Sequence, residues 1–177
     1  MPRLFIGLQI PEHISVQLTA LGGGLPGARW IEPNDFHLTL RFIGDIDRLE
    51  ANEVVQTLEN LRQSKVTVTL NELTAFGKDR PHSLVAKGPL NTSLAELQFN
   101  LEYKIRNIGL APDSRKFMPH VTLARLKGAS SQSVADYLTH RCLRAPLRFE
   151  ATAVTLYSAR ASVGGGPYIK EATYPLF

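Results

Sequence analysis

The chain has 177 residues, of which 44% are hydrophobic, and it carries 20 lysines and arginines against 16 aspartates and glutamates. This length suits one domain or two small lobes that share a cleft, and the mildly basic balance favours phosphate-bearing partners without identifying them. The single cysteine, Cys142, excludes an internal disulfide, and no apolar run reaches the eighteen or so residues of a membrane span. We therefore expect a cytoplasmic protein that neither crosses nor binds a membrane. Because no extra apolar helix suggests a partner, we also expect a monomer.

Hydrophobic periodicity, capping residues and turn residues predict alternating strands and helices along the whole chain. In chain order, the predicted elements are a strand over 4–10, a helix over 11–21, strands over 28–32 and 37–45, a helix over 49–61, a strand over 66–73 that continues towards 77, its hairpin partner over 82–87, a helix over 91–108, a strand from 120, a helix over 130–140, and strands over 148–158 and 168–177. The glycines at 164–166 precede Pro167 and predict a turn, not a phosphate-binding loop.

Many of these strands are linked as hairpins, which favours an α+β fold over a parallel one. A strand followed by a helix recurs in both halves. We therefore expect a single domain over 1–177, bilobal, with two pseudo-symmetric lobes of mostly antiparallel sheet, helices on the outside and a central cleft.

One four-residue phrase occurs twice, as His37-Leu38-Thr39-Leu40 and as His120-Val121-Thr122-Leu123. Side chains alternate between the two faces of a strand, so each copy places a histidine and a threonine on one face and two aliphatic residues on the other. An ordinary buried strand with a hydrogen-bonded histidine is the plainer interpretation of one copy. The repetition in the same order favours a shared site.

A pair of imidazoles and a pair of hydroxyls suit the hydrolysis of a phosphodiester. The reaction needs a base that deprotonates water, an acid that protonates the departing alkoxide, and donors for the phosphoryl oxygens. Histidine can act as either near neutral pH, and the threonine hydroxyls can donate hydrogen bonds. Each motif offers one histidine beside a threonine, a poor ligand set, so we expect no metal and no other cofactor.

Strand alternation makes conflicting predictions for the residues that follow each motif. Arg41 shares the parity of His37 and Thr39, so on a regular strand it would face the cleft and bind phosphate. Arg125 has the opposite parity, and only a bulge or the end of the strand would turn it inwards. A solvent-facing charge is the alternative for both arginines. His13, His82 and His140 lie outside the repeat and are expected to have no catalytic role.

These residues resemble the two-histidine (2H) phosphoesterase superfamily, and within it the LigT-like RNA 2′,3′-cyclic phosphodiesterases, also called 2′-5′ RNA ligases. The resemblance extends over essentially the whole chain. It rests on the segments 3–6, 29–30, 37–44, 117–125, 157–160 and 166–168.

The resemblance implies a metal-independent enzyme that opens the 2′,3′-cyclic phosphate of an RNA end or a nucleotide to a 2′-phosphomonoester, with reversible 2′-5′ ligation as a further activity. It implies that His37 donates a proton to the leaving 3′ oxygen and that His120 activates water. It also implies that Arg125 holds the phosphate and that Phe42 contacts a base or sugar, although alternation places Phe42 on the core side. Tyr168 is added to the substrate-binding candidates.

Two other functions remain open from the sequence. One is a nucleotide-binding module of the same fold without turnover. The other is a phosphodiesterase for 2′-5′ linkages or for other cyclic phosphates.

Overall fold

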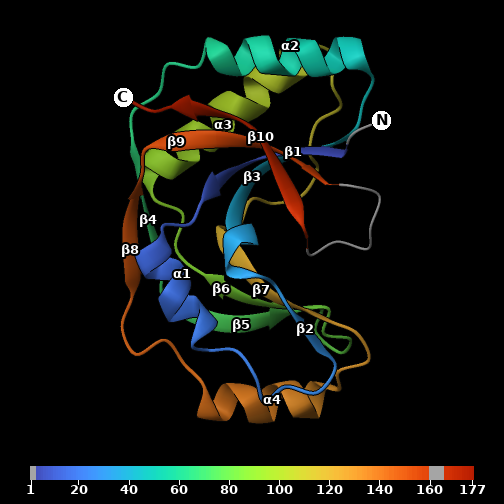
Figure 1. The fold of residues 1–177 in the computed structure, drawn as a ribbon, viewed down its shortest axis with the longest axis vertical. Helices are drawn as coiled ribbons and strands as arrows, with labels where there is room; N and C mark the ends of the chain where they lie inside the picture. Colours follow the sequence, from blue (N-terminus) through green and yellow to red (C-terminus); the bar gives the residue numbers. More distant parts are fainter. Residues whose placement is uncertain (1–2, 160–165) are drawn as a thin grey trace.

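The computed structural model describes residues 3–159 and 166–177, so Arg160 and the first two glycines of the turn predicted at 164–166 lie outside the described residues. The elements in chain order are β1 (Arg3–Gln9), α1 (Glu12–Thr19), β2 (Ala28–Trp30), a 3-10 turn (Pro33–Asp35), β3 (His37–Asp45), α2 (Arg48–Glu59), β4 (Val66–Leu70), β5 (Glu72–Phe76), β6 (Ser83–Lys87), α3 (Thr92–Asn107), β7 (His120–Leu126), α4 (Ser131–His140), β8 (Leu147–Ala151), β9 (Ala153–Ala159) and β10 (Tyr168–Pro175) (Figure 1).

The α+β prediction is confirmed, and α2, α3 and α4 begin where the sequence provides a capping side chain. Asp47 and Glu50 form a reciprocal capping box at the start of α2. The side chain of Asn91 accepts a hydrogen bond from the Leu94 amide at the start of α3. None of the helices in the described ranges is long and apolar enough to span a membrane.

An antiparallel sheet runs through both lobes in the order β10-β9-β1-β3-β7-β6-β5, with β2 paired to β7. In Figure 1, β1, β9 and β10 lie in the upper half and β5, β6 and β7 in the lower half, while α2 and α4 close the two ends. β3 and β7, the strands that carry the two motifs, are neighbours at the centre. The halves of the sheet therefore meet along the repeated phrase.

Two predicted strands are each divided in the structure. The strand expected over 66–77 breaks at Asn71 into β4 and β5, and the strand expected over 148–158 breaks at Thr152 into β8 and β9. β4 and β8 pair with each other as a separate two-stranded sheet, whereas β5 pairs with β6 and β9 pairs with β1. The alternation of apolar residues loses its phase at both breaks. A bulge within one strand produces the same irregularity, so the sequence pattern alone does not reveal that the chain changes sheets.

Each of two consecutive segments contains a strand, a helix, a motif strand, a helix and two further strands. The first is β1-α1-β3-α2-β4-β5, with β2 inserted, and the second is β6-α3-β7-α4-β8-β9. The last strand of each segment pairs with the first strand of the other, since β5 pairs with β6 and β9 with β1. Each lobe therefore contains strands of its own segment and one strand from the other segment, β9 beside β1 and β5 beside β6.

Candidate active site

The two motif strands pair with each other at the second residue of each motif. Leu38 of β3 pairs with Val121 of β7 in antiparallel register. On either side of this pair, His37 lies opposite Thr122 and Thr39 lies opposite His120. Diagonal neighbours in such a pair are roughly 7–8 Å apart between Cα atoms, so the two histidines share one face at a distance that a phosphate group can span.

Both motif strands have a bulge at the fourth residue of the motif. On β3, Thr39 pairs with Gly7 and Arg41 pairs with Ile6, which leaves Leu40 without a partner on β1. On β7, Thr122 pairs with Val85 and Ala124 with Leu84, which leaves Leu123 without a partner on β6. Each extra residue reverses the alternation beyond it. The residue five positions after each histidine is thereby turned to the histidine's face.

A cavity of about 530 Å³ opens on this face, a volume within the range of small-molecule sites. Seven of the eight site residues predicted from the sequence line it, namely His37, Thr39, Phe42, His120, Thr122, Arg125 and Tyr168. The eighth, Arg41, does not. Of the two features that could turn Arg125 inwards, the structure has a bulge, at Leu123. The placement of Phe42 on the core side is wrong, because the bulge at Leu40 turns it to the cavity.

Aromatic rings enclose the imidazole of His37. The ring centroids of Phe5, Tyr168 and Tyr157 lie 4.7, 5.0 and 5.4 Å from that of His37. Burial among these rings is the main reason that the pKa of His37 falls from 6.5 to about 4, and the positive charge of Arg125 lowers this pKa further. The hydrogen bond from His37 Nδ1–H to the carbonyl oxygen of Asp35, 2.8 Å long, opposes this shift only in part.

His120 has the same backbone anchor in a different setting. Its Nδ1–H donates to the carbonyl oxygen of Met118, 2.7 Å away, and the ring of Phe76 meets its imidazole edge to face at 4.9 Å. Burial, and then the charges of Arg125 and Arg115, lower the pKa of His120. Because a carbonyl oxygen only accepts, both Nδ1 atoms carry hydrogen, and Nε2 is the atom of each ring that can gain or lose a proton.

Arg125 lies on the same face as the two histidines. Its Nη1 donates to Ser83 Oγ at 3.0 Å, and its Nε is buried without a hydrogen-bond partner among the described residues. An anion in the cavity would supply an acceptor for this guanidinium, which has no carboxylate partner within residues 3–159 and 166–177. Its charge also lowers the pKa of both imidazoles.

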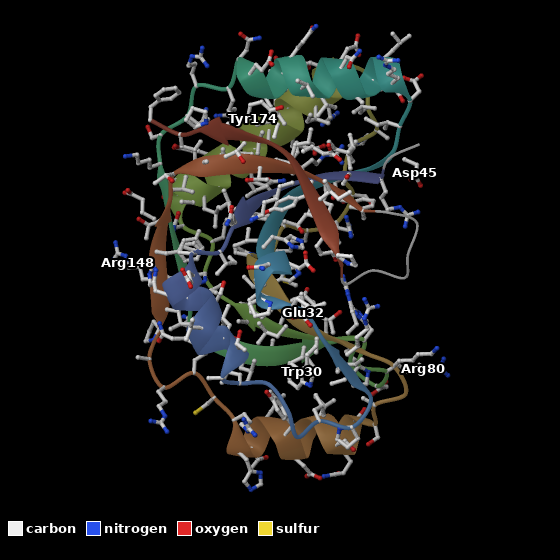
Figure 2. The ribbon with its side chains drawn as sticks, in the orientation of Figure 1. Trp30, Glu32, Asp45, Arg80, Arg148 and Tyr174 are labelled. Carbon is white, nitrogen blue, oxygen red and sulfur yellow. The ribbon has the colours of Figure 1, made fainter. Side chains whose placement is uncertain are left out.

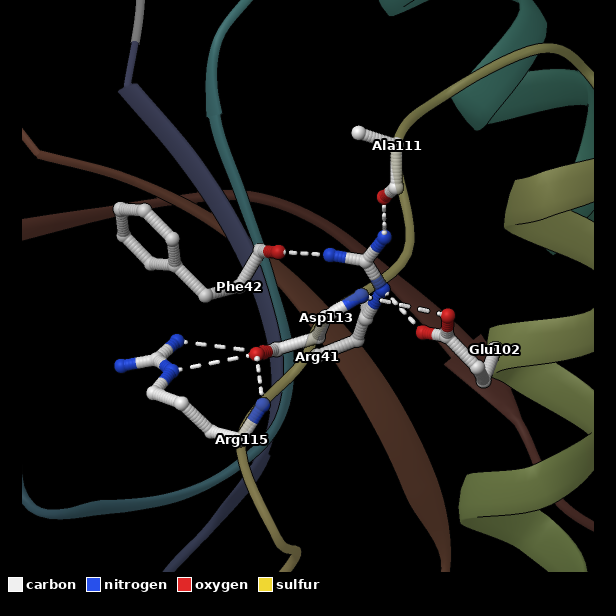
Figure 3. Close-up of polar contacts among 6 residues, drawn as sticks. All are labelled: Arg41, Phe42, Glu102, Ala111, Asp113 and Arg115. Carbon is white, nitrogen blue, oxygen red and sulfur yellow. Dashed lines mark hydrogen bonds and ion pairs between the residues drawn. The ribbon is translucent and has the colours of Figure 1, made fainter.

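The prediction that Arg41 faces the cleft is wrong. The bulge at Leu40 turns its side chain to the opposite face of β3, where it is 4% exposed and forms an ion pair with Glu102 of α3 (Figure 3). The guanidinium also donates to the carbonyl oxygens of Phe42 and Ala111. Arg41 therefore joins β3 to α3 and to the segment that precedes β7, and it is a structural residue.

Several residues that shape the cavity were not singled out from the sequence. They include Phe5, Phe76, Ser83, Asp113 and Met118, all of which line it. Phe5 lies in the strand predicted over 4–10. The signal for its role is its register opposite Phe42, which only strand pairing reveals. Asp35 links two residues of the cavity wall. Its Oδ1 accepts a hydrogen bond of 3.0 Å from the Tyr168 amide, and its carbonyl oxygen accepts one from His37.

The described part of the chain contains no cluster of three histidine, cysteine, aspartate or glutamate side chains that could hold a metal ion. The groups of the two motif strands that line the cavity are the imidazoles of His37 and His120, the hydroxyls of Thr39 and Thr122, and the guanidinium of Arg125. Such a set can bind a tetrahedral anion and move protons on and off its oxygens. The fold and the cavity are thus those of a two-lobed protein that binds and acts on phosphate esters.

Comparison with known proteins gives the family. The model of the LigT-like phosphoesterase family matches residues 8–86 and again residues 85–168, once for each motif. The chain belongs to the LigT-like phosphoesterase family.

Relatives and solved structures agree with this assignment. An RNA 2′,3′-cyclic phosphodiesterase of Aeropyrum pernix is 36% identical over 108 residues, which are 60% of this chain and 61% of that protein. One of Methanocaldococcus jannaschii is 24% identical over 174 residues, or 96% of this chain and 99% of that protein. The crystal structure of E. coli LigT complexed with 3′-AMP has the same fold, with a TM-score of 0.78, 23% identity and 99% of both chains covered.

Proposed function

We propose that this chain is an RNA 2′,3′-cyclic phosphodiesterase that hydrolyses the cyclic phosphate to a 2′-phosphomonoester without a metal ion. The observation that carries the proposal is the pairing of Leu38 with Val121, which puts the imidazoles of His37 and His120 on one face of the sheet. Each imidazole is hydrogen-bonded to a backbone carbonyl oxygen, and Arg125 on the same face has an Nε without a partner among the described residues. The family and the names of the relatives support the same reaction.

In the proposed reaction, the oxygen of a water molecule attacks phosphorus and the bond from phosphorus to the 3′ oxygen breaks. One Nε2 takes a proton from the water, and the other Nε2, which is protonated at the start, gives its proton to the leaving 3′ oxygen. Arg125 binds the non-bridging oxygens, and the hydroxyls of Thr39 and Thr122 donate to them as their charge grows. If the 5′ hydroxyl of a second RNA strand replaces water as the nucleophile, its oxygen attacks phosphorus, the bond to the 3′ oxygen breaks and a 2′-5′ phosphodiester forms. The proton transfers are the same, so the same residues would support ligation.

The resemblance assigns the acid to His37 and the base to His120. The aromatic rings around His37 disfavour a proton there in the empty cavity, since they lower its pKa to about 4. A bound phosphodiester carries a negative charge that raises the pKa of both imidazoles. If His37 is the acid, it must therefore gain its proton when the substrate binds.

The test is hydrolysis of an oligonucleotide that ends in a 2′,3′-cyclic phosphate, with EDTA present and the position of the product phosphate determined. We expect a 2′-phosphate, and a loss of about 10²–10⁴-fold in kcat for His37→Ala and for His120→Ala. His140→Ala, at the exposed end of α4, is the matched control and should keep full activity. A substrate with sulfur as the leaving 3′ atom needs no proton, so it should restore turnover to the variant that lacks the acid.

Full activity of His120→Ala would contradict the proposal, as would complete dependence on a divalent metal ion. Tight binding of nucleotides by the wild type without any turnover would identify a binding module instead. Cleavage of 2′-5′ linkages in preference to cyclic phosphates would keep the acid-base pair and change the substrate.

A further inference from the structure

The cavity has positive charges beyond the one assigned to the reacting phosphate. Among the described residues that line it, the cations besides Arg125 are Arg3, Arg115 and Lys116, and the only carboxylate is Asp113. Arg3 is paired with Asp45 at 3.1 Å. Arg115 and Lys116 both belong to the segment that leads into β7, and both are exposed.

Arg115 lies over an aromatic ring that comes from the other motif strand. Its guanidinium carbon is 5.5 Å from the centroid of the Phe42 ring, within the range of a cation–π contact. Figure 3 shows how Asp113 orients it: the carboxylate accepts hydrogen bonds from Nε, Nη2 and the backbone amide of Arg115, each 3.1 Å long. Phe42 and Arg115 thus form one wall of the cavity from two distant parts of the sequence.

The segment that carries Arg115 is anchored at both ends. Near its start, Arg41 donates to the carbonyl oxygen of Ala111, and the Asp113 amide donates to Glu102 Oε1 at 3.3 Å. Near its end, the carbonyl oxygen of Met118 binds His120. The position of Arg115 is therefore set by the same buried ion pair that joins β3 to α3.

Single-stranded RNA is bound by aromatic rings and guanidinium planes on which bases stack, together with cations that contact its phosphates. A guanidinium that lies on a ring leaves its outer face available to a base. A strand that ends in a 2′,3′-cyclic phosphate continues only through its 5′ oxygen. Any further nucleotide and phosphate must therefore leave the reacting group in that direction.

Resting on the proposed function, we propose that Phe42, Arg115 and Lys116 form a subsite for the nucleotide on the 5′ side of the cyclic phosphate. The base of that nucleotide stacks against the Phe42–Arg115 wall, and its phosphate is held by Lys116 and Arg115. The enzyme then favours the end of an RNA strand over a free cyclic mononucleotide.

The test compares the Kd of an RNA trinucleotide ending in a 2′-phosphate with the Kd of a nucleoside 2′-phosphate, over a range of salt concentrations. The preference for the trinucleotide should fall by roughly fivefold to tenfold in Arg115→Ala and in Lys116→Ala, as one charged contact is lost. The slope of log Kd against log salt should decrease by about 0.7 for each phosphate contact removed. Arg148→Ala, which removes an exposed charge on β8 at the far side of the molecule (Figure 2), should change neither quantity.

An unchanged preference and an unchanged salt slope in both cavity variants would overturn the subsite. Turnover of the cyclic trinucleotide, measured in parallel, separates this result from a failure of the proposed function. If the wild type does not open the cyclic phosphate but its trinucleotide binding depends on Arg115, the subsite stands and the proposed reaction is wrong. If turnover is normal and binding is indifferent to Arg115 and Lys116, only the subsite is wrong.

Discussion

The two imidazoles occupy corresponding positions in the repeat but differ in their surroundings. Both donate Nδ1–H to the carbonyl oxygen of the residue two positions earlier, which fixes the same tautomer. His37 then packs among three aromatic rings, whereas His120 meets one ring, and the charge of Arg115 contributes to lowering its pKa. The repeated phrase predicted the similarity of the two histidines. The difference arises from Phe5, Tyr157 and Tyr168, which lie far from His37 in the sequence.

The low pKa of His37 makes the stability of the protein depend on pH. In the unfolded chain this imidazole has its ordinary pKa near 6.5, so the folded state with a pKa of about 4 binds the proton more weakly. The free energy of unfolding is therefore unaffected by this group above pH 6.5. As the pH falls from 6.5 to 4, the unfolded chain takes up the proton first, and the free energy of unfolding decreases by up to about 3 kcal/mol. Urea denaturation of the wild type and of His37→Gln at a series of pH values measures it. Parallel stability curves for the two proteins over this window would contradict the assignment.

The β-bulges decide which residues of the motif strands reach the cavity. Alternation from each histidine selects Arg41 and Ala124, but the extra residues Leu40 and Leu123 exchange these for Phe42 and Arg125. A bulge depends on how a strand pairs with its neighbour, and the sequence of one strand does not specify that pairing. This is why alternation misplaced Arg41 and Phe42 although the strand itself was predicted correctly.

Arg41 should contribute strongly to stability through its contacts with α3. Arg41→Ala leaves Glu102 without its partner in a site where both side chains are largely buried, so the free energy of unfolding should fall by about 3–5 kcal/mol. In the double variant Arg41→Met, Glu102→Leu no unpaired charge remains, and stability should recover much of this loss. Chemical denaturation measures all three proteins. A loss below about 1 kcal/mol in Arg41→Ala would show that the ion pair behaves like an exposed one.

The exchange of terminal strands makes the two lobes interdependent. β5 ends the first segment but pairs with β6 of the second, and β9 ends the second but pairs with β1 of the first. β4 and β8, which precede these strands, pair with each other between the lobes. A fragment that contains one segment alone therefore lacks a strand of its own lobe and exposes unpaired sheet edges.

We expect that neither half of the chain folds by itself. Fragments 1–79 and 80–177, divided within the turn between β5 and β6, should each show poor amide dispersion in NMR spectra and no cooperative unfolding transition. Mixing them should restore both, because β5 of the first fragment pairs with β6 of the second and β9 of the second pairs with β1 of the first. Cooperative unfolding of either fragment alone would show that the segments are independent domains.

Local sequence patterns were enough to predict most of the helices and strands, the α+β class and the two motifs that carry the histidines. These depend on hydrophobic period, capping residues and a repeated phrase, all of which act over a few neighbouring residues. The residues that accompany the histidines depend on contacts between distant segments: the bulges at Leu40 and Leu123, the aromatic rings around His37, and the contact between Phe42 and Arg115. The physical reason is that strand register and side-chain burial are set by pairing between segments far apart in the chain, where a shift of one residue exchanges the two faces of a strand.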